Sequence, residues 1–362
     1  MRVHVVDPPA YTPAYDHALC SALGSSGLEV ELFTSAFRHG ALPAPERYGR
    51  RELFYQHADR GARASRAIRL AEHVPDMLRY RRVAGAADIV HFQWLTLPAL
   101  DRRLLPRGRP LVITAHDILP REPLAGSRTA QIALLREFDA VIAHSQSGRA
   151  RLIAEAGLDP GRVHVIAHGA FAHLAALAEA PLPAELPATT RPVVLYFGLI
   201  RPYKGLDVLI EAWKGIEGAE LWIVGRPRVD ITRLRAAAGA SVRWVPRYVS
   251  DLELAACFRR ADLVVLPYRE IEQSGVLATA LAFATPILAS DVGGFRDAAA
   301  AGAARLVAPG DVAALHEALV GLLADAGERK RLSDGAQALA VGDASWERVA
   351  AQTAALYRSL VS

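Results

Sequence analysis

Residues 197–205 read FGLIRPYKG, and this stretch decides the fold of the second half of the chain. An apolar strand ends at Gly198, Arg201 and Lys204 follow, and LDVLIEAW (206–213) then has apolar residues at helical spacing. A strand, a short loop and a helix in this order are typical of a parallel α/β sheet. Because the start of a helix presents unpaired N–H groups, two cations beside it predict an anion site. We expect a diphosphate there.

Lys204 carries weight because lysine is rare in this chain. Only three of the 42 basic residues are lysines, at positions 204, 214 and 330, and the others are arginines. A lysine in this loop indicates a role for a compact ammonium group rather than a planar guanidinium. A surface lysine without a role is the alternative.

Length and composition predict a two-domain α/β protein. The 362 residues suffice for two cores, and a hydrophobic content of 52% with a mean hydropathy of +0.16 excludes a disordered chain. Cys20 and Cys257 lie far apart without metal-ligand spacing, which favours two reduced thiols. The start MRVHVVDPPAY does not resemble a signal peptide, and no apolar stretch reaches about 18 residues. We therefore expect a cytoplasmic protein.

The formal charge of +4 is modest, but arginines gather in one region. A helix carrying them would suit peripheral contact with an anionic membrane surface, or the steering of an anionic substrate, and a solvated helix face is the alternative. Nucleic-acid binding is set aside, because no aromatic interleaving or recognition module accompanies the charge. The oligomeric state is open. The arginines concerned are Arg60, Arg63, Arg66, Arg69, Arg79, Arg81 and Arg82.

The first half of the chain alternates between apolar strands and amphipathic helices. This alternation predicts a parallel, doubly wound sheet. Helices are expected at Tyr15–Leu23, Ala64–Arg81 and Ser145–Ala156. The expected strands are Arg2–Val6, Glu29–Thr34, Asp88–Phe92, Pro110–Thr114, Ala140–His144 and Val163–Ala167.

A proline-rich stretch, APLPAELPATTRP (180–192), then interrupts the pattern and predicts a linker. We expect an N-terminal domain over 1–180, a linker over 181–192 and a C-terminal domain over 193–344. Two such halves predict a cleft, with ligands outside the carboxyl ends of the strands. The strands expected after the linker are Val193–Phe197, Glu220–Val224, Val242–Val245, Leu263–Leu266, Ile287–Ser290 and Ala304–Val307.

The last segment, SWERVAAQTAALYRSL, begins at Ser345 and has the apolar stripe of a helix. Ser345 is a plausible N-cap. We expect this helix, over 345–362, to pack back on the N-terminal domain.

FGLIRPYKG, EQSGVLATALAFATPILASDVGG and the closing SWERV helix together resemble the retaining GT-B glycosyltransferases of family 4, also called group 1. The similarity covers most of the chain and is strongest over 163–362, where the motifs follow the family's order and spacing. The resemblance implies the GT-B fold, in which two Rossmann-like, doubly wound parallel-sheet domains face each other across a cleft. It also implies that the first domain binds an acceptor and the second a nucleotide-diphosphate sugar, with no cofactor.

The resemblance assigns the FGLIRPYKG loop to the donor diphosphate. Arg201 and Lys204 would neutralise the diphosphate and the charge that grows on the leaving phosphate. Gly198 would lie beside the donor. Leu199 stands where the family often has arginine, so that Arg201 is displaced along the loop.

The second motif is YREIEQSGVLATALAFATP, at 268–286. Ser274 predicts an N-cap, and the first amides of the following helix would point at the diphosphate. Glycine at this turn permits close approach. These amides belong to Gly275, Val276 and Leu277.

Relatives carry two glutamates around this turn. The first, which contacts the hydroxyls of the donor sugar, corresponds to Glu272 or Glu270, and Glu272 is favoured because it directly precedes the turn. A solvated loop carboxylate is the alternative for either. The second position holds Thr279, a departure from the family, where a glutamate holds the ribose hydroxyls. Threonine offers one weaker, uncharged hydrogen bond.

Two further stretches complete the expected donor site. WIVGRPR ends a strand at a glycine turn near the nucleotide, where an arginine contacts phosphate or ribose or lies on the surface. WVPRYVSDLEL resembles the stretch whose main chain reads the base, so the base itself cannot be named. The residues concerned are Gly225, Arg226, Arg247, Tyr248 and Val249.

Histidines end three strands of the first domain. His116, in ITAHDILPRE, matches a histidine that faces the transferred sugar in relatives. Its imidazole would bond a sugar hydroxyl, or its carbonyl would stabilise developing positive charge; a buried structural histidine is the alternative. His144 and His168 are better explained as hydrogen-bonded histidines at the face toward the other domain.

The acceptor is expected at the loop after the first strand, DPPAYTPAYDHAL. Its prolines replace the glycine-rich loop of many relatives. Asp16 and His17 would contact the acceptor, although Asp16 is equally explained as an N-cap. Trp94 ends another strand, where an aromatic face stacks on a sugar, and core packing explains it as well.

These assignments predict a retaining glycosyltransferase that moves a sugar to an acceptor hydroxyl of a glycan, a glycolipid or a small molecule. The chain shows no paired carboxylates for a covalent intermediate, and the resemblance implies transfer on the front face of the donor. It also shows no DxD motif, so we expect that no metal is needed. The alternatives are a sugar-nucleotide epimerase of the same fold, and a non-catalytic partner that binds nucleotide or glycan.

Overall fold

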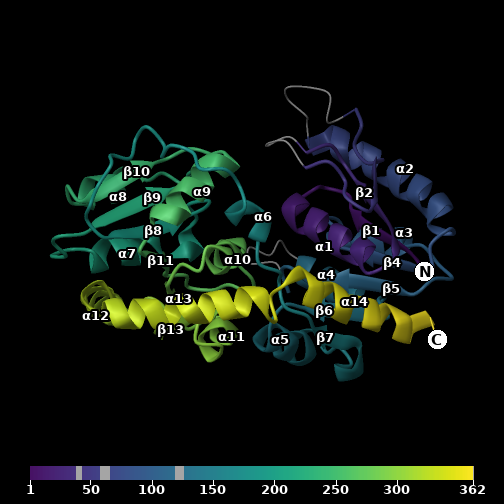
Figure 1. The fold of residues 1–362 in the computed structure, drawn as a ribbon. Helices are drawn as coiled ribbons and strands as arrows, with labels where there is room; N and C mark the ends of the chain where they lie inside the picture. The colour runs from purple at the N-terminus through teal and green to yellow at the C-terminus, as the bar shows by residue number, and fades with distance from the viewer. Residues whose placement is uncertain (38–42, 58–65, 119–125, 362) are drawn as a thin grey trace. The chain divides into compact units, whose positions relative to one another are not determined.

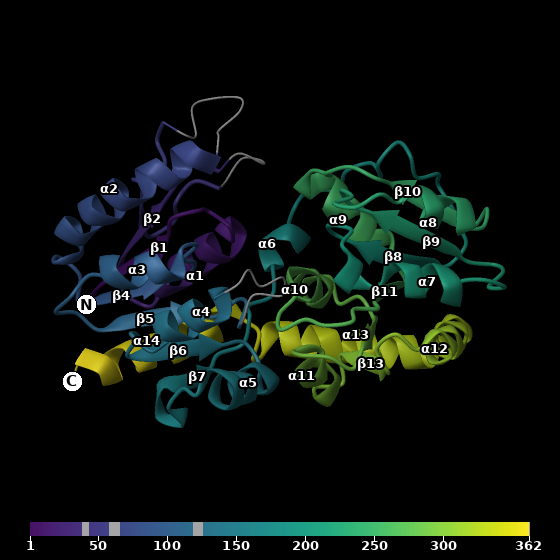
Figure 2. The same cartoon turned by 180° about the vertical axis from the view of Figure 1, so that it is seen from behind.

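The computed structural model describes residues 1–37, 43–57, 66–118 and 126–361. The chain forms two compact units, each with its own parallel sheet. Unit 1 comprises Met1–Gly169 and Trp346–Ser362, and unit 2 comprises Ala170–Ser345. Figures 1 and 2 show the elements of each unit from opposite sides.

In the described part of unit 1, seven strands form a sheet in the order β3-β2-β1-β4-β5-β6-β7. Every neighbouring pair is parallel. Strands β2 and β3 extend the sheet on one side of β1, and β4 to β7 extend it on the other side, which is the doubly wound arrangement. The strands are β1 (Arg2–Asp7), β2 (Glu29–Thr34), β3 (Gly49–Glu52), β4 (Ile89–Phe92), β5 (Leu111–Thr114), β6 (Ala140–Ala143) and β7 (Val163–Val165).

Helices cover both faces of this sheet. On one face, α2 to α5 bury side chains such as Met77, Leu134 and Leu152 against Phe92. On the other face, α1 packs against α14, and Tyr357 of α14 contacts His91. The helices of unit 1 are α1 (Pro13–Ser25), α2 (Arg66–Ala84), α3 (Pro98–Leu104), α4 (Ser127–Leu135), α5 (Gln146–Ala156) and α14 (Trp346–Val361).

Unit 2 contains a parallel sheet in the order β10-β9-β8-β11-β12-β13. Its strands are β8 (Val193–Phe197), β9 (Glu220–Val224), β10 (Val242–Val245), β11 (Leu263–Leu266), β12 (Ile287–Ser290) and β13 (Ala304–Val307). Its helices are α6 (Ala172–Ala175), α7 (Leu206–Ala212), α8 (Thr232–Ala237), α9 (Asp251–Arg260), α10 (Gly275–Ala282), α11 (Phe295–Ala300), α12 (Val312–Ala324) and α13 (Ala326–Val341).

Strand β8 shows why these strands are continuously apolar. Val193 and Leu195 join a core with α9, α10 and α13, whereas Val194 and Tyr196 join a core with α7 and α12. Because successive side chains point to opposite faces, a sheet covered on both faces needs apolar residues at every position.

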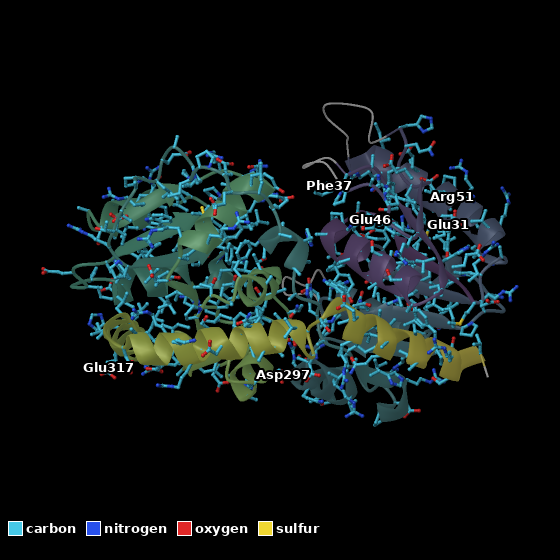
Figure 3. The ribbon with its side chains drawn as sticks, in the orientation of Figure 1. Glu31, Phe37, Glu46, Arg51, Asp297 and Glu317 are labelled. Carbon is cyan, nitrogen blue, oxygen red and sulfur yellow. The ribbon has the colours of Figure 1, made fainter. Side chains whose placement is uncertain are left out.

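The structure differs from the sequence-based elements at the edge of unit 1. Strand β3 was not expected, because GRRE is polar and mostly exposed. It pairs with β2, and Arg51 forms an ion pair with Glu31 while its guanidinium lies 5.8 Å from the centre of the Phe33 ring. Figure 3 shows Arg51 beside Glu31. Charge pairing rather than burial accounts for this edge strand.

The two units meet in sequence at Gly169/Ala170 and Ser345/Trp346, whereas the sequence analysis drew its first boundary at residue 180. Within the described ranges, no helix is long and apolar enough to cross a membrane. The predicted arginine stripe is only partly visible, since Arg60 and Arg63 lie outside the described residues and α2 begins at Arg66.

Candidate active site

Two glycines bring the loops after β8 and β9 together in unit 2. Gly198 has a φ of +102° and Gly225 a φ of +148°. A Cβ on Gly225 would lie 1.9 Å from the carbonyl oxygen of Gly198, so only glycine permits this contact. Ile200 bridges to Pro227 on the same two loops. The carboxyl ends of the two strands therefore form one continuous surface.

Lys204 lies over this surface. It ends a short 3-10 turn and is only 8% exposed. A Cβ on Gly198 would lie 3.0 Å from Lys204 Nζ and 3.2 Å from Val276 Cγ2, so the ammonium, the glycine and the first turn of α10 converge. The ammonium also lies 5.0 Å from the centre of the Tyr268 ring, a cation–π contact. Arg201, which starts the same turn, is exposed.

An arginine that the sequence analysis missed braces this turn. Arg269 binds the Asp207 carboxylate through two hydrogen bonds of 2.9 and 2.6 Å and donates to the Pro202 carbonyl at 2.9 Å. Its backbone N–H donates to the Tyr203 carbonyl at 2.7 Å. The guanidinium also lowers the pKa of Asp207. In the sequence, only its place within the motif YREIEQSG could have indicated a role for Arg269.

The predicted N-cap of α10 is confirmed, and it changes the set of available amides. The Ser274 hydroxyl accepts the Leu277 N–H at 3.3 Å, so that amide is already used. Gly275 and Val276 remain as the first amides of the helix. Thr279 is 4% exposed and its hydroxyl donates to the Gly275 carbonyl at 2.8 Å, so its oxygen is left only to accept.

The two candidate glutamates lie in different environments. Glu270 is exposed, whereas Glu272 is 8% exposed and packs against the loop after β12. The Glu272 carbonyl accepts the Gly294 N–H at 3.2 Å. A Cβ on Gly293 would lie 1.8 Å from the Ile271 carbonyl oxygen, so glycine is required for this approach.

The predicted base-reading stretch contains an arginine engaged with protein carboxylates. Arg247 binds Glu185 and Glu253, with closest contacts of 2.7 and 2.6 Å, and the pairs raise the pKa of Arg247 and lower that of Glu253 to about 2. Tyr248 is exposed and Val249 is buried. The Arg247 side chain is thus occupied by two ion pairs, and a ligand would contact the main chain of this stretch instead.

Arg226 is exposed directly after Gly225, and its carbonyl accepts the Ile200 N–H at 3.0 Å. Its side chain therefore lies at the rim of the loops after β8 and β9.

His116 lies at the carboxyl end of β5 in unit 1, with both ring nitrogens in contact with protein. Its Nε2 is 3.0 Å from Gln93 Oε1, and its Nδ1 is 3.3 Å from His144 Nε2. Trp94 stacks on the ring at 5.2 Å and Tyr15 meets it edge-on at 4.8 Å. Burial holds the pKa of His116 well below its usual range, so the imidazole is neutral. An imidazole contact to sugar would require one of its two polar contacts to break.

The other two histidines are hydrogen-bonded, as the sequence analysis favoured. His144 Nδ1 lies 3.0 Å from the Ile166 carbonyl oxygen, and His168 Nδ1 lies 2.8 Å from that of Gly169.

The loop after β1 is held by buried carboxylates. Thr12 stands at the N-cap position of α1, so the expectation of Asp16 as N-cap is wrong. The Thr12 N–H donates to Asp7 Oδ2 at 3.2 Å, its hydroxyl donates to Asp16 Oδ1 at 3.4 Å, and its oxygen accepts the Trp94 indole N–H at 3.1 Å. Burial raises the pKa of both carboxyls, that of Asp7 to about 6. With 1% exposure, Asp16 is not presented to solvent, whereas His17 is half-buried beside Tyr48.

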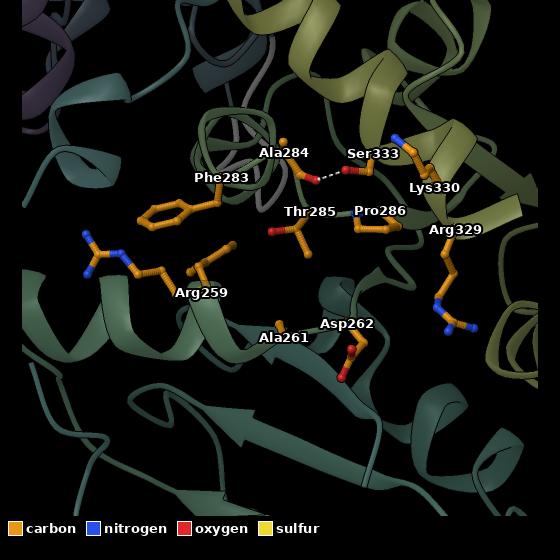
Figure 4. A pocket seen from close by; sticks show the side chains of 11 residues that line it. Arg259, Ala261, Asp262, Phe283, Ala284, Thr285, Pro286, Arg329, Lys330 and Ser333 are labelled. Carbon is orange, nitrogen blue, oxygen red and sulfur yellow. Dashed lines mark hydrogen bonds between the residues drawn. The ribbon is translucent and has the colours of Figure 1, made fainter. Parts of the chain in front are cut away.

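A separate groove opens at the other end of the unit 2 sheet. Asp262 and Pro286, which immediately precede β11 and β12, line it together with Arg259 and Lys330, and the Ser333 hydroxyl donates to the Ala284 carbonyl at 2.7 Å (Figure 4). Ligands of parallel sheets bind at the carboxyl ends of strands, so this groove is not the donor site. Across the described ranges, no three His, Cys, Asp or Glu side chains are grouped to hold a metal ion.

Comparison with known proteins agrees with this arrangement. Residues 15–170 match the model of Glycosyltransferase Family 4, and residues 191–325 match that of Glycosyl transferases group 1. A D-inositol 3-phosphate glycosyltransferase of Catenulispora acidiphila is 30% identical over 331 residues, which cover 81% of this chain and 76% of the relative. The chain belongs to glycosyltransferase family 4.

Another relative matches over a shorter stretch. A GDP-mannose:glycolipid 4-beta-D-mannosyltransferase of Xanthomonas campestris pv. campestris is 34% identical over 190 residues, which are 50% of each chain. The match thus spans about half the length of this relative.

Solved structures share the fold over the full chain. Sucrose-phosphate synthase of Thermosynechococcus elongatus superposes with a TM-score of 0.77 at 22% identity, covering 99% of both chains. HepE of Anabaena, solved in complex with UDP-glucose, superposes with a TM-score of 0.76 at 18% identity, covering 99% of this chain and 100% of that one. The fold of this family 4 chain is therefore GT-B.

Proposed function

We propose that this chain transfers a sugar, with retention of configuration, from a nucleoside-diphosphate sugar to an acceptor hydroxyl. The observation that carries the proposal is the convergence of Lys204, Gly198 and the first turn of α10 at the carboxyl ends of the unit 2 strands. A buried ammonium beside free helix amides is a preorganised site for a diphosphate. Family membership supports the same reaction class.

In the proposed reaction the protein mainly stabilises the leaving diphosphate. The bond from the anomeric carbon to the phosphate oxygen breaks as the bond to the acceptor oxygen forms on the same face, and the acceptor proton passes to the phosphate. Lys204 and the amides of Gly275 and Val276 stabilise the charge on the departing diphosphate, with Arg201 closing over it. No metal is required, because these groups supply the positive charge.

The remaining contacts of the proposed site are assigned by resemblance to the family, and the burial or exposure of each residue supports them. Glu272 holds hydroxyls of the donor sugar, and the main chain of residues 247–249 reads the base. Because both ring nitrogens of His116 contact Gln93 and His144, a role of this residue toward the sugar would use its carbonyl rather than its imidazole. Trp94 and His17 line the acceptor side.

The donor and acceptor are tested by ligand screening. Curated relatives are named for transfer to a glycolipid, to phosphatidyl-myo-inositol and to inositol 3-phosphate, so these three acceptor classes are the first to try. Thermal shifts with UDP, GDP and ADP should show stabilisation by at least one, followed by turnover of its sugar. Full activity in excess chelator is expected, and loss of turnover there would overturn metal independence.

One observation favours the alternative of a non-catalytic binding partner. Thr279 stands where relatives have a glutamate, and its hydroxyl donates its hydrogen to the Gly275 carbonyl. Slow hydrolysis of the donor without acceptor separates the two functions: an enzyme releases nucleoside diphosphate, and a binding partner does not.

A further inference from the structure

Gln93 lies between two buried histidines of unit 1. Its side chain is 1% exposed, with Oε1 3.0 Å from His116 Nε2 and its amide nitrogen 3.3 Å from His91 Nε2. His91 Nε2 also lies 2.7 Å from the Thr114 hydroxyl oxygen. His91 Nδ1 in turn lies 2.6 Å from the Tyr357 hydroxyl. On the other side, His116 Nδ1 lies 3.3 Å from His144 Nε2. These contacts form one continuous chain.

A backbone carbonyl fixes the direction of this chain. The Ile166 oxygen, 3.0 Å from His144 Nδ1, accepts hydrogen bonds and has none to donate. His144 Nδ1 must therefore carry a hydrogen. Because burial lowers the pKa of His144 to about 4, the ring is neutral and its Nε2 is bare. His116 Nδ1 must then donate to His144.

The same assignment of ring hydrogens extends to His116 and Gln93. A neutral imidazole with its hydrogen on Nδ1 presents a bare Nε2, and a bare nitrogen needs a donor opposite it. The amide oxygen and nitrogen of Gln93 have nearly the same shape, so rotation about the last side-chain bond exchanges them. Turning the nitrogen toward His116 places the oxygen toward His91 Nε2. The His116 contact becomes a donor–acceptor pair, and the hydrogen on His91 Nε2 lies between two acceptors, the Gln93 oxygen and the Thr114 hydroxyl oxygen.

The opposite orientation carries a charge penalty. With its oxygen toward His116, Gln93 needs a hydrogen on His116 Nε2, which leaves Nδ1 bare. Either His144 then donates from both nitrogens and becomes an imidazolium, or two bare nitrogens face each other at 3.3 Å. A buried cation costs several kcal/mol unless it is paired. The neutral arrangement satisfies every contact without that charge.

We infer that Gln93 is a positioning residue: its amide N–H donates to His116 Nε2 and holds the ring as the neutral Nδ1–H tautomer. Hydrogens then run in one direction, from the Tyr357 hydroxyl through His91, Gln93, His116 and His144 to the Ile166 carbonyl. The ring cannot swing away, so the main chain at residue 116 is held in place. A neutral ring also adds no positive charge to the carboxyl end of β5.

The groups around His116 allow this tautomer to be tested by pH. Tyr15 of α1 faces the ring edge-on, His144 touches it, and His91 and His168 act on it electrostatically. Burial lowers the pKa of His91 and His168 to about 3, so these neighbours are neutral at pH 7. Asp117 follows His116 in the chain.

The direct test is nitrogen NMR of the intact protein labelled with 15N-histidine. Two-bond proton–nitrogen spectra should show Nδ1–H for His116 and His144 and Nε2–H for His91 at pH 7. Single histidine-to-asparagine variants assign the signals. An Nε2–H tautomer at His116, or an imidazolium at His144, overturns the inference, and neither outcome depends on activity.

A second test rests on the proposed transfer reaction. In Gln93→Glu, a carboxylate faces His116 Nε2 and draws a second proton onto the ring, since an opposite charge raises the pKa of a histidine by roughly 1–3 units. We expect kcat of the variant to fall about tenfold at about pH 5 and to recover as the pH rises, while KM for the donor stays within about threefold.

Two controls complete this test. Gln337→Glu makes the same exchange at an exposed position of α13 and should leave the profile unchanged. A Gln93→Glu profile parallel to that of the parent protein contradicts the inference. Absence of any turnover in the parent protein contradicts the proposed function instead, and the NMR result still decides the tautomer.

Discussion

Replacing Lys204 with methionine removes the buried charge of the candidate donor site and keeps most of the side-chain volume. If a diphosphate oxygen binds about 4 Å from Nζ, two unit charges at an effective dielectric constant of about 20 interact by about 4 kcal/mol. Because this interaction strengthens as charge grows on the leaving group, kcat/KM should fall by about 10³-fold. The assay measures the initial rate of nucleoside diphosphate release with the preferred donor.

The chain offers a matched control for this change. Lys214 is exposed and paired with Glu211 at 2.7 Å, so Lys214→Met should keep the parental rate. Thermal unfolding without ligand, measured on both variants, separates loss of charge from loss of fold. If Lys204→Met retains kcat/KM within about threefold, the ammonium does not stabilise the leaving group and the reasoning fails.

Three further changes test other parts of the structure. Gly225→Ala drives a Cβ into the Gly198 carbonyl and should lower the unfolding free energy by about 3 kcal/mol or more in urea titrations; an unchanged midpoint would contradict the close approach. Ser274→Ala removes the cap of α10 and should cost about 1 kcal/mol in the same assay, whereas no loss would mean that water replaces the cap. Asp16→Asn should gain stability relative to the parent as the pH rises from 4 to 8, because burial beside Asp7 raises the Asp16 carboxyl pKa and the parent loses stability above about pH 4. A constant difference between the two proteins would argue against a raised Asp16 pKa.

Most strands were predictable because apolar runs between turns are a local signal. Strand β8 has the bounds that the sequence predicts, Val193–Phe197, since every position is covered by one of two cores. Strand β3 was not predictable from apolar pattern, since its partner Glu31 and the ring of Phe33 come from β2.

In the candidate site, too, local features were predictable and contacts between distant segments were not. The Ser274 cap followed from local sequence, and the structure bears it out. The engagement of His116 by Gln93 and His144 joins the ends of three strands, a relation that spacing along the chain does not encode. The Arg269 brace of the Lys204 turn is likewise a contact between loops distant in sequence.

Because unit 1 includes the segment from Trp346 onward, its assembly must await the synthesis of α14, which follows unit 2 in the sequence. Unit 2 is continuous in sequence and emerges complete from the ribosome while α1 and His91 still lack their partner helix. During synthesis, unit 2 can therefore be complete while unit 1 still lacks α14. Deletion of α14 should therefore destabilise unit 1, whose α1 and His91 it contacts, before it affects unit 2.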